Sequence, residues 1–254
     1  MLEISHLTKR FGGLAAVHDV STTIEAGRIN AIIGPNGAGK TTFFNLVSGT
    51  IAPTTGSIVY EGRDITGLRA DQVALLGISR TFQATTLFDM ATVLDNLIVG
   101  HRLRTQSGLM DVLLGTRRLK EEERICRVKA QEALDFVGLS HMSHRIAADM
   151  SQEERKRVAF ALALATEPKI VLLDEPAGGV NPEETVGIAE LIQKLVKHGM
   201  TVCLIEHKMD MIMSLADKIM VLNYGEKIAE GTPAEIRSNP AVIDAYLGSE
   251  HADV

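Results

Sequence analysis

Residues 34–41 read Gly-Pro-Asn-Gly-Ala-Gly-Lys-Thr and match the pattern G-x-x-x-x-G-K-[ST] in full. Glycines let backbone N–H groups converge on phosphate oxygens, and the positive end of the following helix dipole favours an anion there. Lys40 would reach the β- and γ-phosphates of a nucleotide, and the Thr41 hydroxyl would bind Mg²⁺. A glycine-rich turn without a ligand is the alternative, which the strand before the loop and the helix after it disfavour. The predicted nucleotide-binding residues of this loop are Gly34, Pro35, Asn36, Gly37, Ala38, Gly39, Lys40, Thr41 and Thr42.

A second segment, residues 171–176, reads Val-Leu-Leu-Asp-Glu-Pro and ends a buried strand pattern in two carboxylates. Asp174 would emerge at the carboxyl end of the strand, where open α/β sheets bind their ligands. Its carboxylate could hold Mg²⁺ through the water shell of the ion. Glu175 is placed to accept a proton from an attacking water. An acidic turn after a strand is common by itself, and its combination with the phosphate loop is what favours a nucleoside triphosphatase site.

Both motifs need a sheet to position them, and short apolar strand patterns occur around each. Further patterns predict a helix over 121–134 that ends near Gly138, and a helix after Asn181 with Pro182 in its first position. Thr232 begins a capping box with a proline at the first helical position. Strands and helices alternate around a charged stretch at 92–149, which predicts a mostly parallel α/β core with an antiparallel β edge and a helical subdomain. The predicted strands are residues 2–4, 21–24, 30–33, 57–60, 78–82, 169–173 and 201–205.

The composition excludes several classes of protein. The 254 residues contain 26 basic and 32 acidic side chains, and a net charge of −6 argues against nucleic acid or anionic lipid as the main partner of the whole surface. Cys126 and Cys203 share no motif, so a disulfide framework is not expected and a reducing compartment fits. The longest charge-free stretch, residues 41–60, is rich in threonine and is no membrane helix. Any membrane-spanning part is therefore expected in another chain.

Several further residues make nearly the whole chain resemble the nucleotide-binding subunit of an ATP-binding cassette (ABC) transporter. Phe11 matches the aromatic that stacks on adenine, and Gln83 matches the glutamine that contacts Mg²⁺ and the attacking water. Asn181 falls in the family's D-loop, and His207 matches the histidine that contacts the γ-phosphate. Each also has a purely structural alternative. Phe11 could be an ordinary strand aromatic and Gln83 a solvated side chain at a strand end. Asn181 could be only a helix cap, and His207 could only terminate a strand. Their order relative to the two phosphate motifs favours the family roles.

The resemblance implies a P-loop NTPase-type α/β fold, ATP and Mg²⁺ as cofactors, and ATP hydrolysis coupled to transport. It implies one ABC ATPase domain over 1–254, with a RecA-like catalytic core and β subdomain at 1–91 and 168–254 and a helical subdomain at 92–167. The catalytic residues would be Glu175, His207 and Gln83, and the metal-binding residues Thr41, Gln83 and Asp174.

Within the family, the stretch from Gln83 to Leu139 and residues 223–248 are similar to the ATPase subunits of bacterial high-affinity branched-chain amino-acid importers. Relatives of these importers carry urea and short amides, so another small polar solute is an alternative. The resemblance implies transmembrane permease subunits, a second ABC ATPase subunit and, indirectly, an extracytoplasmic solute-binding protein, with no nucleic acid. It implies a peripheral position on the cytoplasmic face of the inner (plasma) membrane. A soluble non-transport ABC ATPase and a module that holds nucleotide without turnover are the alternatives from other classes.

The signature segment departs from the family pattern Leu-Ser-Gly-Gly-Gln. Here it reads Met150-Ser151-Gln152-Glu153-Glu154, so Ser151 survives and both glycines are replaced. Ser151 would contact the γ-phosphate bound by the opposite subunit, and carboxylates in the same helical turn would repel that phosphate. The same residues form a capping box, which starts a helix without any ligand. A heterodimer with a cassette that has an intact signature is therefore favoured over a homodimer.

Overall fold

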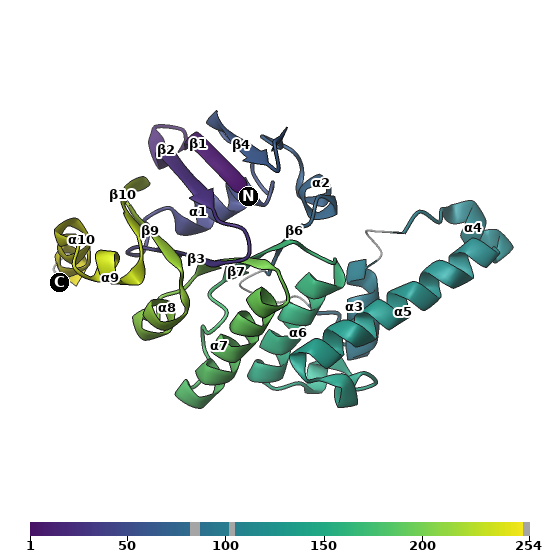
Figure 1. Ribbon diagram of the computed structural model, residues 1–254. Helices are drawn as coiled ribbons and strands as arrows, with labels where there is room; N and C mark the ends of the chain where they lie inside the picture. The colour runs from purple at the N-terminus through teal and green to yellow at the C-terminus, as the bar shows by residue number, and fades with distance from the viewer. Residues whose placement is uncertain (82–86, 102–104, 251–254) are drawn as a thin grey trace.

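The computed structural model describes residues 1–81, 87–101 and 105–250 and contains two β-sheets. The first is a four-stranded antiparallel sheet in the order β2-β1-β4-β5, at the top of Figure 1. Most apolar side chains of its long strands are buried, whereas many polar ones are exposed, which is typical of a sheet with one solvated side. These strands are β1 (Leu2–Phe11), β2 (Leu14–Ile24), β4 (Thr55–Tyr60) and β5 (Arg63–Asp64).

The second sheet has six strands in the order β10-β9-β3-β8-β7-β6, and all neighbours are parallel except β10 and β9. Every residue of β3, β7 and β8 is buried, as expected for central strands covered on both faces. Because these strands are parallel, their carboxyl ends meet at one edge of the sheet. The strands are β3 (Ile29–Ile33), β6 (Ile78–Arg80), β7 (Ile170–Asp174), β8 (Thr201–Ile205), β9 (Lys218–Asn223) and β10 (Glu226–Gly231).

Helices cover both faces of the six-stranded sheet. Helix α1 (Lys40–Val47) lies between the two sheets, where Phe43 and Phe44 pack with apolar residues of both. On the other face, α6 (Gln152–Ala165) and α7 (Pro182–Lys197) pack against β7 and β8, below the sheet in Figure 1. The remaining helices are α2 (Ala70–Leu75), α3 (Val93–His101), α4 (Leu109–Leu114), α5 (Arg117–Val137), α8 (Met209–Leu215), α9 (Pro233–Arg237) and α10 (Pro240–Glu250), with single 3₁₀ turns at Ser140–Met142 and Ala147–Asp149.

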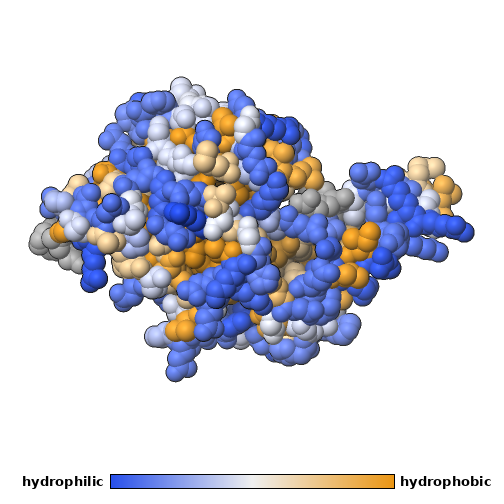
Figure 2. Space-filling view, viewed as in Figure 1, coloured by the Kyte–Doolittle hydropathy of each residue, from blue (hydrophilic) through white to orange (hydrophobic). Residues whose placement is uncertain are grey.

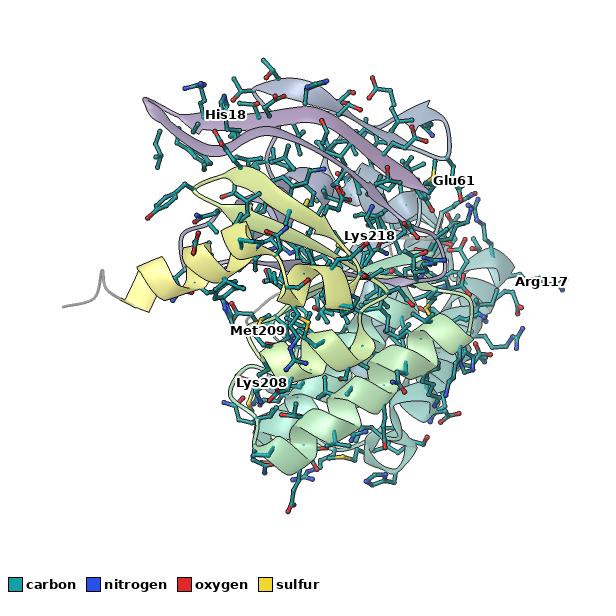
Figure 3. All side chains as sticks on the ribbon, turned by 60° about the vertical axis from the view of Figure 1, so that its left-hand side comes forward. His18, Glu61, Arg117, Lys208, Met209 and Lys218 are labelled. Carbon is teal, nitrogen blue, oxygen red and sulfur yellow. The ribbon has the colours of Figure 1, made fainter. Side chains whose placement is uncertain are left out.

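Helices α4 and α5 form an arm that extends away from the sheets, at the right of Figure 1. Most of the α4 side chains at its end are apolar and exposed, and orange and pale orange residues lie there in Figure 2. Arg117, at the start of α5, points outward into solvent in Figure 3. In the part of the chain that the structure describes, no helix has the length and hydropathy to cross a membrane.

The predicted fold class is confirmed, since a mostly parallel sheet and an antiparallel sheet are both present. The predicted local signals are confirmed as well. Helix α5 contains the predicted helix and ends at Gly138, whose φ of 77° is left-handed. Asn181 and Thr232 each accept a hydrogen bond from the backbone N–H three residues later and cap α7 and α9.

Candidate nucleotide-binding site

The phosphate loop connects the end of β3 to the start of α1, and two of its glycines allow close backbone packing. Gly34 has φ 150°, and a Cβ there would lie 2.0 Å from the carbonyl oxygen of Leu222 on β9. Gly39 has φ 98°, and a Cβ there would lie 2.3 Å from the carbonyl oxygen of Ala16 on β2. Since neither contact leaves room for a side chain, both positions require glycine. The loop is thereby fixed against a strand of each sheet.

Lys40 is buried, and its ammonium is held inside the loop. Nζ donates hydrogen bonds to the carbonyl oxygens of Gly34 at 2.7 Å and Pro35 at 2.8 Å. Burial lowers the pKa of Lys40, and the negative charges of Glu175 and Asp174 oppose that shift. The loop thus contains a desolvated cation whose two hydrogen-bond acceptors are neutral carbonyl oxygens, and a phosphate group would complement its charge.

A cavity of about 340 Å³ lies at the carboxyl edge of the six-stranded sheet. The phosphate loop and the start of α1 form one wall, and Glu175 and His207 come from the ends of β7 and β8. Segments from β2 and from the β9–β10 turn, which connects the two strands, complete it. The lining residues are Leu14, Ala15, Ala16, Asn36, Gly37, Ala38, Gly39, Lys40, Thr41, Thr42, Glu175, His207, Tyr224 and Gly225.

Glu175 and His207 form a hydrogen-bonded pair at this cavity. His207 Nε2 lies 2.9 Å from Glu175 Oε1, and both side chains are partly exposed. The backbone N–H of Glu175 donates to the carbonyl oxygen of Ile205 at 2.9 Å, which ties the turn after β7 to the end of β8. Glu175 has φ 48°, a left-handed conformation that is uncommon for a side chain of this size. Such strained positions persist where the surrounding structure fixes them, and they are frequent at functional sites.

Asp174 is the last residue of β7 and is buried beside this cavity. Its Oδ2 accepts a hydrogen bond from Arg80 Nη2 at 2.7 Å. Its Oδ1 is buried and has no hydrogen-bond partner among the described residues. A buried carboxylate oxygen without a partner is costly, and a bound cation or its water would satisfy it. This carboxylate therefore fits a Mg²⁺ site.

Six predicted site residues lie outside the cavity lining, and Gln83 lies outside the described residues. The six are Gly34, Pro35 and Asp174, described above, and Phe11, Asn181 and Ser151. Phe11 ends β1, is exposed, and has Lys9 Nζ 5.2 Å from the centre of its ring. Asn181 and Ser151 are N-caps of α7 and α6. Gln83 belongs to the segment 82–86, which the structure does not describe. Leu14 and Tyr224 line the cavity instead and were not singled out in the sequence.

The carboxylates of the signature segment are engaged within this chain. Glu154 Oε2 accepts from the backbone N–H of Ser151 at 2.7 Å, and Ser151 Oγ accepts from the N–H of Glu154 at 3.2 Å. Arg145 also contacts Glu154, at 3.5 Å. Glu153 pairs with Arg157 one turn later along α6, at 2.8 Å. The segment is thus a fully formed capping box with partly neutralised charges.

Glu206 is a positioning residue whose role the sequence did not indicate. Its side chain is buried and accepts three backbone N–H groups, from Ala177 at 2.8 Å, His207 at 2.7 Å and Lys208 at 3.2 Å. It therefore holds the turn after Glu175 against the segment that carries His207. Lys208, at the start of α8 in Figure 3, extends the same connection by donating to the carbonyl oxygen of Val180 at 3.1 Å.

Comparison with known proteins agrees with this geometry. Residues 17–178 match the family model "ABC transporter", and residues 226–252 match "Branched-chain amino acid ATP-binding cassette transporter". The chain is 42% identical to the high-affinity branched-chain amino acid transport ATP-binding protein BraF of Pseudomonas aeruginosa, over 98% of each chain. It is 41% identical to LivG of Escherichia coli, again over 98% of each. A crystal structure of an ABC transporter cassette in its ADP conformation matches with a TM-score of 0.85 and 33% identity, over 98% of each chain.

Proposed function

The chain belongs to the ABC transporter family, as an ATP-binding protein of the branched-chain amino acid (LivG/BraF) type, and we propose that it powers the import of branched-chain amino acids. One observation carries this function: a single cavity is lined by the phosphate loop, by Glu175 and by His207. A nucleotide in that cavity would have its phosphates on the loop and a hydrogen-bonded acid–imidazole pair on the other side. That arrangement supports hydrolysis rather than binding alone.

In the proposed mechanism, the loop N–H groups and Lys40 hold the β- and γ-phosphates of ATP and offset their charge. Glu175 accepts the proton of the water that attacks the γ-phosphate, and the products are ADP and phosphate. His207 holds the Glu175 carboxylate in place and contacts the γ-phosphate. Thr41, Asp174 and Gln83 would hold Mg²⁺, which when bound neutralises charge on the transferred phosphoryl group. Phe11 is the proposed stacking partner of adenine.

The chain is a component of a transporter complex that contains permease subunits, and we place the permease contact on the helical region at 92–167. Its arm supports this assignment, because a contiguous exposed apolar surface commonly marks a protein contact. Five of the six side chains of α4 are apolar and 55–75% exposed: Leu109, Met110, Val112, Leu113 and Leu114. The proposal implies that the chain lies peripherally on the cytoplasmic face of the inner membrane. The remaining residues, 1–91 and 168–254, would form the catalytic core.

Replacing Leu113 and Leu114 by serine should abolish copurification with the permease subunits and leave the ATPase activity of the isolated chain unchanged. Both side chains are 71% exposed, so the double change removes apolar contact surface without opening a core cavity. Leu75→Ser, on the exposed face of α2, is the matched control and should copurify as the wild type does. Normal copurification of the double variant would exclude the arm as the permease contact.

We further propose that two different cassettes pair in the working transporter. In this family each ATP lies between the phosphate loop of one subunit and the signature serine of the other. A self-paired chain would present Glu153 and Glu154 beside Ser151 at both sites. If the partner cassette has an intact signature, that signature completes the site on this chain's own phosphate loop, which is then competent. Only the site on the partner's phosphate loop, which receives Ser151 with Glu153 and Glu154, is impaired.

The double change Glu153→Gly with Glu154→Gln should raise the ATPase activity of the isolated chain about tenfold, which corresponds to ~1.4 kcal/mol. Arg145 and Arg157 already offset part of the charge, which keeps the expected effect below that of two bare carboxylates. Glutamine in place of Glu154 can still complete the capping box with Ser151, so α6 should remain folded. ATP-dependent dimerisation, measured by size-exclusion chromatography, should increase in parallel. Strong wild-type activity that the double change does not improve would show that both carboxylates serve only the helix cap.

Uptake by whole cells tests the proposed function. Cells without the chain should lose high-affinity uptake of labelled leucine, isoleucine and valine, and the wild-type gene should restore it. The Glu175→Gln variant should not restore it. Loss of urea or amide uptake with normal leucine uptake would favour urea or amides as the transported solutes. Unchanged uptake of all these solutes would favour a non-transport ATPase.

A further inference from the structure

Arg80 is a buried guanidinium that links the two halves of the candidate site, and no sequence pattern indicated a role for it. It ends β6, the strand that leads into the segment containing Gln83. Its side chain is 7% exposed, and that of its partner Asp174 is 1% exposed. An ion pair this deeply buried is maintained only with good geometry and further hydrogen bonds.

The contacts of Arg80 reach both sides of the site. Nη2 donates to Asp174 Oδ2 at 2.7 Å, and Nη1 donates to Asn45 Oδ1 at 2.5 Å. The guanidinium carbon lies 5.7 Å from the centre of the Phe44 ring. Phe44 and Asn45 belong to α1, the helix that begins at Lys40. One side chain thus connects the carboxylate after β7 to the helix behind the phosphate loop.

Thr81 strengthens the same connection through the backbone. Its N–H donates to the carbonyl oxygen of Leu172 at 2.9 Å, and its hydroxyl accepts from the N–H of Asp174 at 3.4 Å. Residues 80 and 81 therefore hold Asp174 at two points: Thr81 accepts from its backbone N–H, and Arg80 donates to its carboxylate. The carboxylate is left with one buried oxygen, Oδ1, that has no partner among the described residues.

We propose that Arg80 is a positioning residue that holds Asp174 through Oδ2, so that Oδ1 remains available to Mg²⁺ bound with the nucleotide. The proposal rests on the hydrolytic function given above. Arg80 neutralises the carboxylate in the absence of the metal and prevents it from rotating toward Lys40. It also couples α1, β7 and the segment that leads to Gln83 into one unit. A purely structural ion pair would stabilise the fold without affecting the response to metal.

Two variants separate these roles. Arg80→Met removes the charge and keeps most of the length, whereas Arg80→Lys keeps the charge but cannot contact Asp174 and Asn45 through a planar fork. Calorimetry of the purified chain would measure ADP and ATP binding with Mg²⁺ and with EDTA. Removal of groups that orient metal ligands commonly costs about 10- to 100-fold in metal affinity. We expect Arg80→Met to reduce the Mg²⁺-dependent gain in nucleotide affinity, and to raise the Mg²⁺ concentration for half-maximal turnover, by that factor. Binding in EDTA should change less than about twofold.

A double-mutant cycle gives the sharper result. In an Asp174→Asn background, Arg80→Met should produce no further change in Mg²⁺ dependence, because the group that it positions has lost its charge. Arg80→Lys should lie between the wild type and Arg80→Met, and it serves as the readout if Arg80→Met melts below the assay temperature. Arg69→Met, at an exposed pair with Asp71, is the matched control and should bind Mg²⁺–nucleotide as the wild type does.

A lower melting temperature with unchanged Mg²⁺ dependence in both Arg80 variants would overturn the proposal, and so would additive effects in the cycle. The proposed function would fail separately, through a wild-type chain that binds no nucleotide under any condition. A wild-type chain that binds and hydrolyses ATP normally, together with Arg80 variants that respond to Mg²⁺ as it does, would reject only the role of Arg80.

Discussion

Glu175→Gln should bind ATP as the wild type does and hydrolyse it on the order of 10²-fold or more slowly. The change replaces the proton acceptor by an amide of nearly the same shape that can still hydrogen-bond to His207, now 2.9 Å away. Single-turnover hydrolysis and calorimetric ATP binding would measure the two effects separately. An ATP-bound dimer should also accumulate if two ATPase subunits can close on the nucleotide, because Glu175→Gln does not consume it.

Glu183→Gln is a suitable control, since Glu183 lies exposed in the first turn of α7 and outside the cavity. It should turn over at the wild-type rate. Wild-type turnover by Glu175→Gln would exclude Glu175 as the general base, and water would then have to be positioned by His207 and Gln83.

Lys40→Ala should weaken ATP binding by about 10- to 100-fold and abolish measurable hydrolysis. Charge-assisted hydrogen bonds contribute about 1.5–3 kcal/mol each, and Lys40 supplies the ammonium nearest the phosphates. The fold should remain intact, because burial lowers the pKa of Lys40 and the folded protein therefore disfavours its charged form. Calorimetry gives the affinity, and circular dichroism with thermal melting checks the fold.

Lys197→Ala provides a comparison in the last turn of α7, where the lysine is exposed and lies outside the cavity. Its ATP affinity should match that of the wild type. Unchanged ATP affinity in a folded Lys40→Ala protein would exclude residues 34–42 as the phosphate site.

Features that depend on residues close together in the chain could be predicted from the sequence. The caps at Ser151, Asn181 and Thr232 and the stop at Gly138 each involve residues no more than a few positions apart. The central strands could be recognised because burial on both faces selects continuous apolar runs. The two phosphate motifs, together with Phe11, Gln83, Asn181 and His207 in their order along the chain, were sufficient to recognise the resemblance to the family.

The remaining strands depended on partners far away in the chain. β9 and β10 were not predicted, although residues 219–222 of β9 form a continuous buried apolar run like those of the central strands. β9 pairs with β3, where Ile33 lies opposite Val221, and β10 is placed by its antiparallel pairing with β9. The long ends of β1 and β2 were also missed, because a bulged antiparallel pairing extends them beyond their apolar alternation. Pairing energy, rather than local preference, decides such segments.

The sequence by itself determined that this chain has a phosphate loop, an acidic pair after a buried strand and the order of an ABC cassette. Only the tertiary structure decided which side chains share the cavity and which ones support them. It brought Leu14 and Tyr224 to the cavity wall, joined Arg80 to Asp174, and set Glu206 under the turn that carries Glu175. The physical reason is burial: a polar group removed from water must find its partners in space, and parallel strands bring together carboxyl ends that lie far apart in the chain.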